Sequence, residues 1–300
     1  MNISSSPLSW LLESLELDSS LFHIGRYCGQ WQASTSGLGR AAFHLVVKNS
    51  CWLHHEGSPP VELKTGDAVF LLRDRPYRLS DSADPQTARC TPYVPMQPLP
   101  GDDGTGLVCG FFHLRSGLTR LILDALPDHL VLRGDDPAQA PARQLFELIL
   151  AECQRPQGPS NAVLERLSQL LLLYVLREQT VHEASFSGLL GLARQAPFNR
   201  LLEQLIARPG HAWSLAEMAD ICGLSRSALF KRVQELTGTS PGNILLSLRV
   251  HQACRLLQQG QPVAQVAEAV GYQSVAAFTR AFAKVTGVLP GAYRKQYANT

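Results

Sequence analysis

Short runs in which apolar and polar positions alternate, or in which several apolar residues follow one another, fill residues 22–114. The clearest are residues 42–47, 51–54 and 107–112, and turn-forming residues separate them. Many short strands with regular turn signals are typical of a β-sandwich or a small β-barrel. Residues 81–105, which contain several prolines, are expected to form a long surface loop.

After about residue 141 the apolar positions recur with a helical period. Residues 142–153 predict one helix and residues 161–178 a second, with residues 154–160 breaking the pattern between them. The second helix has a broad apolar stripe, which suits a place in the domain core and a dimerisation surface equally well. Residues 182–188 are small and polar enough to form an interdomain linker.

The C-terminal third of the chain contains an internal repeat. The sequence Thr-Gly-Thr-Ser-Pro-Gly at residues 237–242 recurs as Thr-Gly-Val-Leu-Pro-Gly at residues 286–291. Upstream of these segments, residues 219–225 match residues 267–274. Such a repeat indicates a duplicated supersecondary unit.

The first copy of the repeat predicts two short helices joined by a glycine turn. Ser214 and Glu217 fit a capping box at the start of the first helix. Gly223 suits the left-handed residue that ends this helix, and Ser225 suits the N-cap of a second helix over residues 226–236. A helix, a glycine turn and a helix with a basic exposed face form the helix-turn-helix pattern.

The second copy repeats this design. A helix over residues 263–270 ends at Gly271, and Ser274 caps another helix over residues 275–282. Residues 243–258 predict one long helix that connects the two units. One such unit is easily mimicked by an ordinary helical hairpin, so the alternative of a helical bundle without a DNA role has to be weighed. Two copies with matched caps and turns favour DNA binding.

The charge distribution agrees with this prediction. The formal net charge is only +2, with 27 Lys/Arg and 25 Asp/Glu. Residues 197–300 contain 11 of the basic residues and 5 of the acidic ones, whereas residues 1–196 contain 16 and 20. An acidic part joined to a basic part indicates two tasks, and the basic part is suited to an anionic polymer.

On these motifs, residues 196–297 resemble the DNA-binding domain of the AraC/XylS family of transcription regulators. The segments that carry the resemblance are residues 215–219, 223–227, 271–274, 278–282 and 286–290. In that family, two recognition helices lie in successive segments of the major groove, about one DNA turn (~34 Å) apart.

The resemblance implies which residues face the bases: Ser227, Ala228, Lys231, Val275, Ala276, Thr279 and Arg280. Lys231 and Arg280 are the best candidates for guanine contacts, because both side chains donate to the O6 and N7 acceptors. The apolar start of the second recognition helix favours contact with thymine methyl groups instead of hydrogen bonds. Arg226, Arg232 and Arg249 are expected to contact phosphate or to brace the fold.

The N-terminal part resembles the cupin-type sensor domain that precedes the DNA-binding domain in many AraC-type regulators. Residues 43–81, 108–112 and 125–128 carry this resemblance. Many cupins bind a metal through a His-x-His pair and a carboxylate, because alternate strand residues point to one face. Here His54 and His55 are adjacent and should point to opposite faces. We therefore expect no metal, no cofactor and no enzymatic activity.

Four residues are candidate sensor residues: Cys109, Cys28, His44 and Tyr77. Tyr77 occupies a position where relatives often have histidine, which leaves His44 as the remaining candidate ligand. Cys109 lies where redox-responsive members of this subgroup have a cysteine, and Cys28 is its candidate partner. A buried free cysteine that packs as a small apolar residue is the structural alternative.

The sequence as a whole predicts a multi-domain α+β protein. We expect an N-terminal cupin-like β-barrel with flanking helices in residues 1–135, a helical segment and linker in residues 136–190, and an all-α double helix-turn-helix domain in residues 191–300. Its function would be that of a DNA-binding transcription regulator that senses a small molecule. A thiol-based redox regulator is the first alternative, and a metal-dependent cupin enzyme is the second.

The expected partners are double-stranded DNA and a small-molecule effector, with RNA polymerase and a second copy of the chain as further candidates. No apolar run approaches the ~18–20 residues of a membrane span, and no signal peptide is visible. The seven cysteines are scattered and include no C-x-x-C pair. This pattern predicts reduced thiols and a cytoplasmic protein.

Overall fold

The structure is a computed structural model that describes residues 6–90, 97–99, 103–114, 116–123, 126–182 and 188–297. The chain divides into two compact units. One contains residues 17–113 and 127–183, and the other contains residues 1–16, 114–126 and 184–300.

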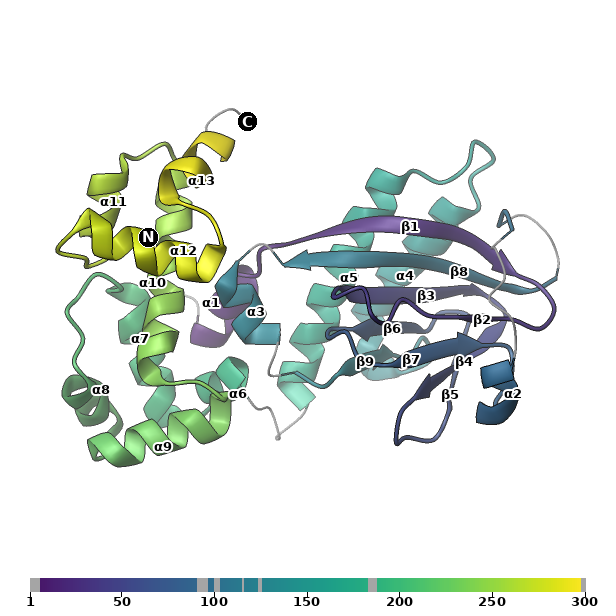
Figure 1. Ribbon diagram of the computed structural model, residues 1–300. Helices are drawn as coiled ribbons and strands as arrows, with labels where there is room; N and C mark the ends of the chain where they lie inside the picture. Colours follow the sequence, from purple (N-terminus) through teal and green to yellow (C-terminus); the bar gives the residue numbers. More distant parts are fainter. Residues whose placement is uncertain are drawn as a thin grey trace. The chain divides into compact units, whose positions relative to one another are not determined.

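The first unit contains two β-sheets (Figure 1). The five-stranded sheet has the order β1 (Leu17–Tyr27), β8 (Thr105–Leu114), β3 (Ala41–Lys48), β6 (Ala68–Leu71) and β9 (His129–Leu132). The four-stranded sheet has the order β2 (Gln32–Ala33), β7 (Tyr77–Ser80), β4 (Ser50–His55) and β5 (Val61–Lys64). Strand β3 pairs antiparallel with β8, which sets His44 opposite Cys109.

The main core of this unit lies between the two sheets. Alternate residues of β8, namely Leu107, Cys109 and Phe111, point to the same face and pack with Leu53 and Leu79 of the other sheet. Gly110 lies on the opposite face of β8, where an added Cβ would overlap the ring of Phe43. Both faces of β8 are buried over residues 105–112, which agrees with the continuous apolar run at residues 107–112.

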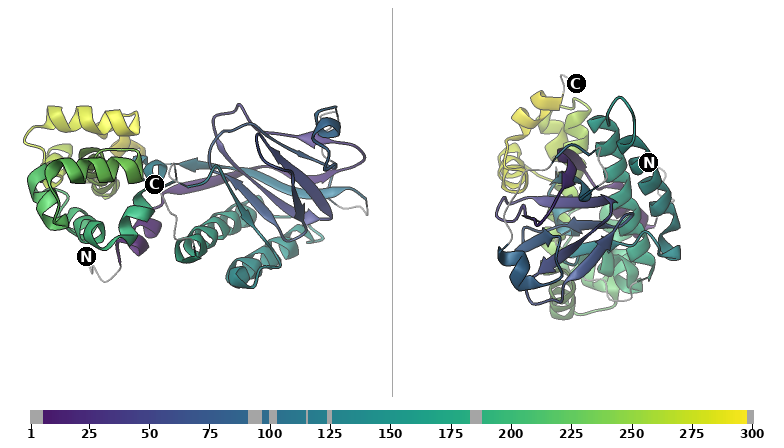
Figure 2. Two further views of the ribbon diagram at one scale, coloured as in Figure 1. Left: turned by 90° about the horizontal axis from the view of Figure 1, so that it is seen from below. Right: turned by 90° about the vertical axis from the view of Figure 1, so that its right-hand side faces the viewer.

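Helices cover the outer side of the five-stranded sheet (Figure 2). They are α4 (Ala140–Cys153), which follows the short 3-10 turn η1 (Pro137–Gln139), and α5 (Asn161–His182). Helix α5 packs on α4 and β1. Both helices occur where the apolar periodicity predicted them, and α5 continues to His182. The remainder of the predicted linker, residues 183–187, lies outside the described residues.

The multi-domain α+β class is confirmed, but the barrel is not. The described strands form two separate antiparallel sheets, and barrel closure would require a continuous ladder of hydrogen bonds between them. Part of the predicted loop is helical instead, since residues Pro85–Cys90 form α2. A proline is well suited to the first position of a helix. The carboxylate of Asp84 accepts hydrogen bonds from Gln86 N and Thr87 Oγ1 at its start, 2.9 and 2.8 Å.

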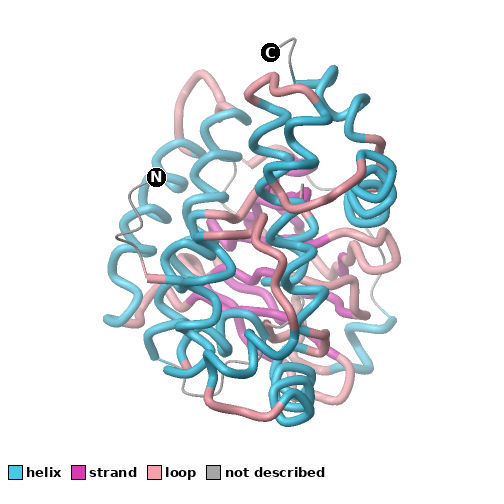
Figure 3. The backbone as a smooth tube through the Cα atoms, turned by 90° about the vertical axis from the view of Figure 1, so that its left-hand side faces the viewer, coloured by secondary structure: helices cyan, strands magenta, loops and turns pink. Residues whose placement is uncertain are grey.

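All described elements of the second unit are helices (Figure 3). From the N-terminal half come α1 (Pro7–Glu13) and α3 (Gly117–Leu123). The others are α6 (Gly188–Arg194), α7 (Ala196–Ala207), α8 (Leu215–Cys222), α9 (Arg226–Thr237), α10 (Pro241–Gln258), α11 (Val263–Ala269), α12 (Val275–Thr286) and α13 (Pro290–Tyr297). Among the described residues, no helix is both long and apolar enough to cross a membrane.

Helices α1 and α3 pack on α6, and they also contact α7 and α10 respectively. Glu16 N donates a hydrogen bond to Thr119 Oγ1, 2.8 Å, which ties the two segments together. The buried ring of His251 on α10 lies edge-on to Trp10, and its Nδ1 lies 3.3 Å from Glu16 Oε1. The division into two units differs from the domain boundaries expected from the sequence. Helices α1 and α3 lie before residue 135, in the expected sensor domain, yet they belong to the second unit.

Candidate DNA-binding and sensor sites

The first helix-turn-helix unit is defined by its caps. Ser214 Oγ accepts from Glu217 N, 3.2 Å, and Glu217 Oε2 accepts from Ser214 N, 2.8 Å, which completes a capping box. These hydrogen bonds, with the one to His211, lower the pKa of Glu217 to about 2. Gly223 ends α8 at φ 64°, and Ser225 Oγ accepts from Ala228 N, 3.2 Å, to start α9.

Helix α9 has one buried face and one exposed face. Leu229 and Val233 are fully buried. Ser227, Ala228 and Lys231 are exposed, as are Arg226 and Arg232. Glu235 lies 3.9 Å from Lys231 Nζ and 3.7 Å from an Arg232 nitrogen. Exposed pairs of this length are weak, so both cations remain available to an anionic ligand.

Helix α12 repeats the arrangement. Ser274 Oγ accepts from Ala277 N, 3.2 Å, and Phe278 and Phe282 anchor the helix in the core. Val275, Ala276 and Arg280 are exposed, whereas Thr279 is half-buried. The exposed face is thus apolar at its start and cationic one turn later.

Arg249 differs from the other candidate arginines because its partners lie within the protein. Its Nε donates to Pro209 O and an Nη donates to His211 O, both at 2.8 Å. Its guanidinium also lies over the ring of Tyr272, 5.6 Å from the centroid. Arg249 therefore connects α10 with the loop before α8 and with the turn of the second helix-turn-helix unit, which favours the bracing role over a phosphate contact.

Three of the four candidate sensor residues meet between the sheets of the first unit. His44 Nδ1 lies 2.9 Å from Cys109 Sγ, and His44 Nε2 lies 2.7 Å from the Tyr77 hydroxyl. Thr35 extends this series of hydrogen-bonded side chains. Its N–H donates to the Tyr77 hydroxyl at 3.1 Å, and its Oγ1 lies 2.5 Å from the same hydroxyl. We call these four residues the buried polar chain.

Burial keeps the buried polar chain uncharged. Desolvation lowers the pKa of His44 to about 3 and raises the pKa values of Cys109 and Tyr77. Two arrangements of the protons satisfy both hydrogen bonds of His44 when all side chains of the buried polar chain are neutral. In one, Tyr77 donates to His44 and His44 donates to the Cys109 sulfur; in the other, Cys109 donates to His44 and His44 donates to Tyr77.

Cys28 lies in a different environment. Its Sγ accepts from Arg26 Nη1 at 3.2 Å, and Arg26 also forms an ion pair with Asp103. Cys28 is half-buried, whereas Cys109 is fully buried and has Cys51 as a neighbour in the same core cluster. The structure does not bring Cys28 into the buried polar chain.

The two adjacent histidines behave differently, as expected for neighbours on a strand. His54 is buried, and its Nε2 lies 2.8 Å from Ser80 Oγ and 2.9 Å from Ser82 O. The ring of His55 lies 5.1 Å from that of His129. Within the described ranges, no group of three or more His, Cys, Asp or Glu side chains is arranged to hold a metal ion.

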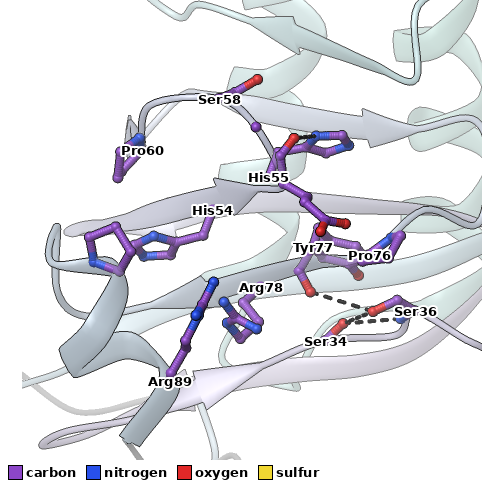
Figure 4. A pocket seen from close by; sticks show the side chains of 13 residues that line it. Ser34, Ser36, His54, His55, Ser58, Pro60, Pro76, Tyr77, Arg78 and Arg89 are labelled. Carbon is purple, nitrogen blue, oxygen red and sulfur yellow. Dashed lines mark hydrogen bonds between the residues drawn. The ribbon is translucent and has the colours of Figure 1, made fainter.

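A cavity of about 400 Å³ opens at the end of the four-stranded sheet (Figure 4). Its lining comes from β4, from β7, from α2 and from the loop after β2: Ser34, Ser36, His54, His55, Tyr77, Arg78 and Arg89 are among its residues. Arg78 and Arg89 could not be identified from the sequence, because only the β4–β7 register and the position of α2 bring them together. Tyr77 joins this pocket to the buried polar chain.

Comparison with known proteins gives consistent matches over both parts of the chain. The family described as Cupin matches residues 6–180, and the family described as Helix-turn-helix domain matches residues 218–296. A putative AraC-like transcription regulator of Streptomyces lividans is 30% identical over 302 residues, which cover 96% of this chain and 98% of the relative. An uncharacterized HTH-type transcriptional regulator of Haemophilus influenzae is 29% identical over 276 residues, covering 89% and 91%.

Among solved structures, the DNA-binding domain of AdpA in complex with a target DNA is similar to the C-terminal part. It shares 29% identity and covers 34% of this chain and 94% of that chain, with a TM-score of 0.33.

Proposed function

The chain belongs to the AraC-like transcription regulators, a family of DNA-binding proteins, and from this premise we propose that its cupin unit senses a small molecule and thereby controls DNA binding. The observation that carries the DNA-binding part of this proposal is the pair of capped helix-turn-helix units, each with an exposed recognition helix. The relatives are regulators, so no catalytic role is assigned. Because DNA is the proposed ligand, the site of action would be the cytoplasm.

In the proposed complex, α9 and α12 enter successive segments of the major groove. Lys231 and Arg280 donate to guanine, while Ser227, Ala228, Val275, Ala276 and Thr279 contact neighbouring base edges and methyl groups. Arg226 and Arg232 neutralise phosphates, which fixes the register of the protein without reading sequence. Arg249 supports this binding indirectly, since it holds the two helix-turn-helix units together.

The chain path offers a route from sensor to DNA-binding unit. Strand β8 carries Cys109 and ends at Leu114, only a few residues before α3 begins at Gly117. Helix α3 belongs to the DNA-binding unit and packs on α10, the helix that connects the two recognition elements. A shift of β8 could be passed to the DNA-binding unit along this short connection, and we include this route in the proposal.

Thiol sensing is the second candidate function, and Cys109 beside His44 is the observation that favours it. Its chemistry is less well supported, because the thiolate is the reactive form and burial raises the pKa of Cys109. Cys28 is more accessible, but its contacts are with Arg26, Gln97 and Asp103 and not with Cys109. A small-molecule effector therefore remains the preferred signal.

We also propose that the protein acts as a homodimer through α5. The exposed or half-buried apolar residues Val163, Leu167, Leu170 and Tyr174 recur at spacings of four, three and four along this helix. This spacing matches the seam of a helix pair. A second copy of the chain is the occupant that would present an identical seam. RNA polymerase is a further proposed partner, consistent with a role in transcription.

DNA binding is tested with full-length protein and fluorescently labelled duplex DNA. We expect the affinity to fall by more than about tenfold between about 50 mM and 200 mM salt, because several phosphates are neutralised. An affinity that does not change with salt would contradict the proposal.

A further inference from the structure

The cavity at the end of the four-stranded sheet contains polar atoms that lack partners in the protein. Arg78 Nε, His54 Nδ1 and His55 Nε2 are all buried, and each lies outside any hydrogen bond among the described residues. Unpaired buried polar atoms are costly and call for an explanation. Two of them, Arg78 Nε and His54 Nδ1, belong to cross-strand partners and lie on one face of the sheet beside the cavity, which indicates a ligand that supplies the missing partners.

The cationic groups of the pocket identify one part of that ligand. Arg78 and Arg89 both line it, from β7 and from α2 (Figure 4), and neither forms an ion pair with a described carboxylate. Glu56 is the acidic residue in the lining, and it is exposed on the hairpin between β4 and β5. Two arginines without an acidic partner form a natural site for an oxyanion, since guanidinium groups bind carboxylate and phosphate through paired hydrogen bonds.

His54 identifies a second part of that ligand. His54 Nε2 contacts the carbonyl of Ser82, which can only accept, so Nε2 carries the proton and Nδ1 presents a lone pair. Desolvation lowers the pKa of His54, so its ring is neutral at pH 7. The His54 ring therefore requires a donor, such as a hydroxyl group.

We propose that this pocket binds a small organic molecule that combines an oxyanion group with several hydroxyl groups, such as a sugar acid or a sugar phosphate. The oxyanion would be held by Arg78 and Arg89, and a hydroxyl group would donate to His54. The volume of about 400 Å³ lies within the ~300–1,000 Å³ of typical small-molecule sites. This inference rests on the proposed sensing function, because it names the chemical class of the effector.

The pocket is also connected to the buried polar chain, so ligand binding could change the hydrogen bonds of that chain. Tyr77 lines the pocket, and its hydroxyl contacts His44, which contacts Cys109 on β8. A ligand hydroxyl that engages Tyr77 would compete with His44 or Thr35 for the phenol proton. The buried polar chain would then change its proton arrangement at the strand that leads to α3.

Isothermal titration calorimetry on the full-length protein tests this assignment. Four probes separate the two recognition elements: gluconate and glucose 6-phosphate carry both, glucose lacks the anion, and hexanoate lacks the hydroxyl groups. We expect gluconate, glucose 6-phosphate or both to bind, and the preferred one identifies carboxylate or phosphate as the anion. Glucose and hexanoate should bind at least about tenfold more weakly. Failure of both hydroxylated anions at millimolar concentration, or equal binding of hexanoate, would overturn the proposal.

Variants locate the site. Arg89→Gln changes an exposed side chain and should preserve the fold, yet it should weaken binding of the hydroxylated anion by about ten- to hundredfold, as should Arg78→Gln. Arg143→Gln, an exposed arginine on α4 outside the pocket, is the matched control and should change nothing. His54→Gln keeps a donor toward Ser82 but removes Nδ1, so it should reduce the preference for gluconate over hexanoate. Unchanged binding in both pocket arginine variants would place the ligand elsewhere.

The same titrations distinguish this inference from the proposed function. DNA affinity is measured separately, with and without the bound probe. If a hydroxylated anion binds through Arg78 and Arg89 but DNA affinity stays the same, the pocket assignment holds and control of DNA binding by this ligand fails. If DNA affinity responds to a probe equally in wild type and in the arginine variants, sensing holds and this pocket is wrong.

Discussion

His44 Nδ1 lies 2.9 Å from Cys109 Sγ in the space between the two sheets. The two residues face each other because β3 and β8 pair in a register that sets them opposite. Neither is charged at neutral pH, since burial lowers the pKa of His44 and raises that of Cys109. The buried polar chain within the apolar core of the cupin unit is therefore uncharged, and this has consequences for stability and for reactivity.

The first consequence concerns the stability of the folded protein at low pH. The pKa of His44 is about 3 in the folded protein and that of His251 about 4, against about 6.5 for an unfolded histidine. Between these values the unfolded chain binds the additional protons, so stability is complete above pH 6.5 and falls as the pH decreases. We expect each unit to lose on the order of 1 kcal/mol of unfolding free energy between pH 7.5 and 5.5, and the cupin unit to lose more, because desolvation also lowers the pKa values of His54 and His129. Urea denaturation at the two pH values measures this loss.

His44→Gln provides the control for the acid prediction. The variant removes the titrating ring, so the pH dependence of the cupin unit should become shallower, whatever happens to its absolute stability. An unchanged pH dependence in His44→Gln would show that His44 titrates normally in the folded protein.

The second consequence concerns thiol reactivity. Cys90 is exposed and Cys28 half-buried, whereas Cys109 and Cys51 are buried and desolvation raises both pKa values. We expect iodoacetamide to modify Cys90 first and Cys28 next, and to modify Cys109 only after unfolding. Mass spectrometry of protein alkylated for increasing times, with and without urea, follows each cysteine. Rapid labelling of Cys109 in the native protein would favour the thiol-sensing alternative.

A third prediction concerns the α5 seam. Leu170 is 44% exposed on this helix, and a carboxylate there would be buried and unpaired in a symmetric helix pair. Leu170→Glu should shift the protein from dimer to monomer at micromolar concentration, as measured by sedimentation velocity. Leu38→Glu is the matched control, because Leu38 is 59% exposed and belongs to the loop between β2 and β3, not to α5. A wild-type protein that sediments as a monomer would exclude this dimer.

The signals that predicted the C-terminal unit are local ones. Ser214, Ser225 and Ser274 all cap helices, because capping depends on residues three positions apart in the sequence. The apolar stripes of α9 and α12 follow from the same short-range periodicity. The helices could therefore be predicted to within a few residues.

Features that depend on distant contacts could not be predicted in this way. Helix α3 belongs to the DNA-binding unit, although along the chain it follows β8 and precedes β9, two strands of the cupin unit. No local sequence pattern indicates this. The bracing role of Arg249 depends on carbonyl groups of Pro209 and His211, about forty positions earlier. The pocket depends on the β4–β7 register, which sets His54 opposite Arg78. The residues that line the pocket form no recognisable motif in the sequence, because they come together only when the strands pair.

The most direct test of the central claim is selection of bound sequences from a random DNA library, with the wild type, Arg280→Ala and Lys231→Ala. For the wild type we expect two sequence blocks separated by about one helical turn, one for each recognition helix. Arg280→Ala should lose the base preference within one block and Lys231→Ala within the other, each by about 1–3 kcal/mol of discrimination. Recovery of no common sequence, or of the wild-type sequence with both variants, would contradict the assignment of α9 and α12 as the elements that read DNA.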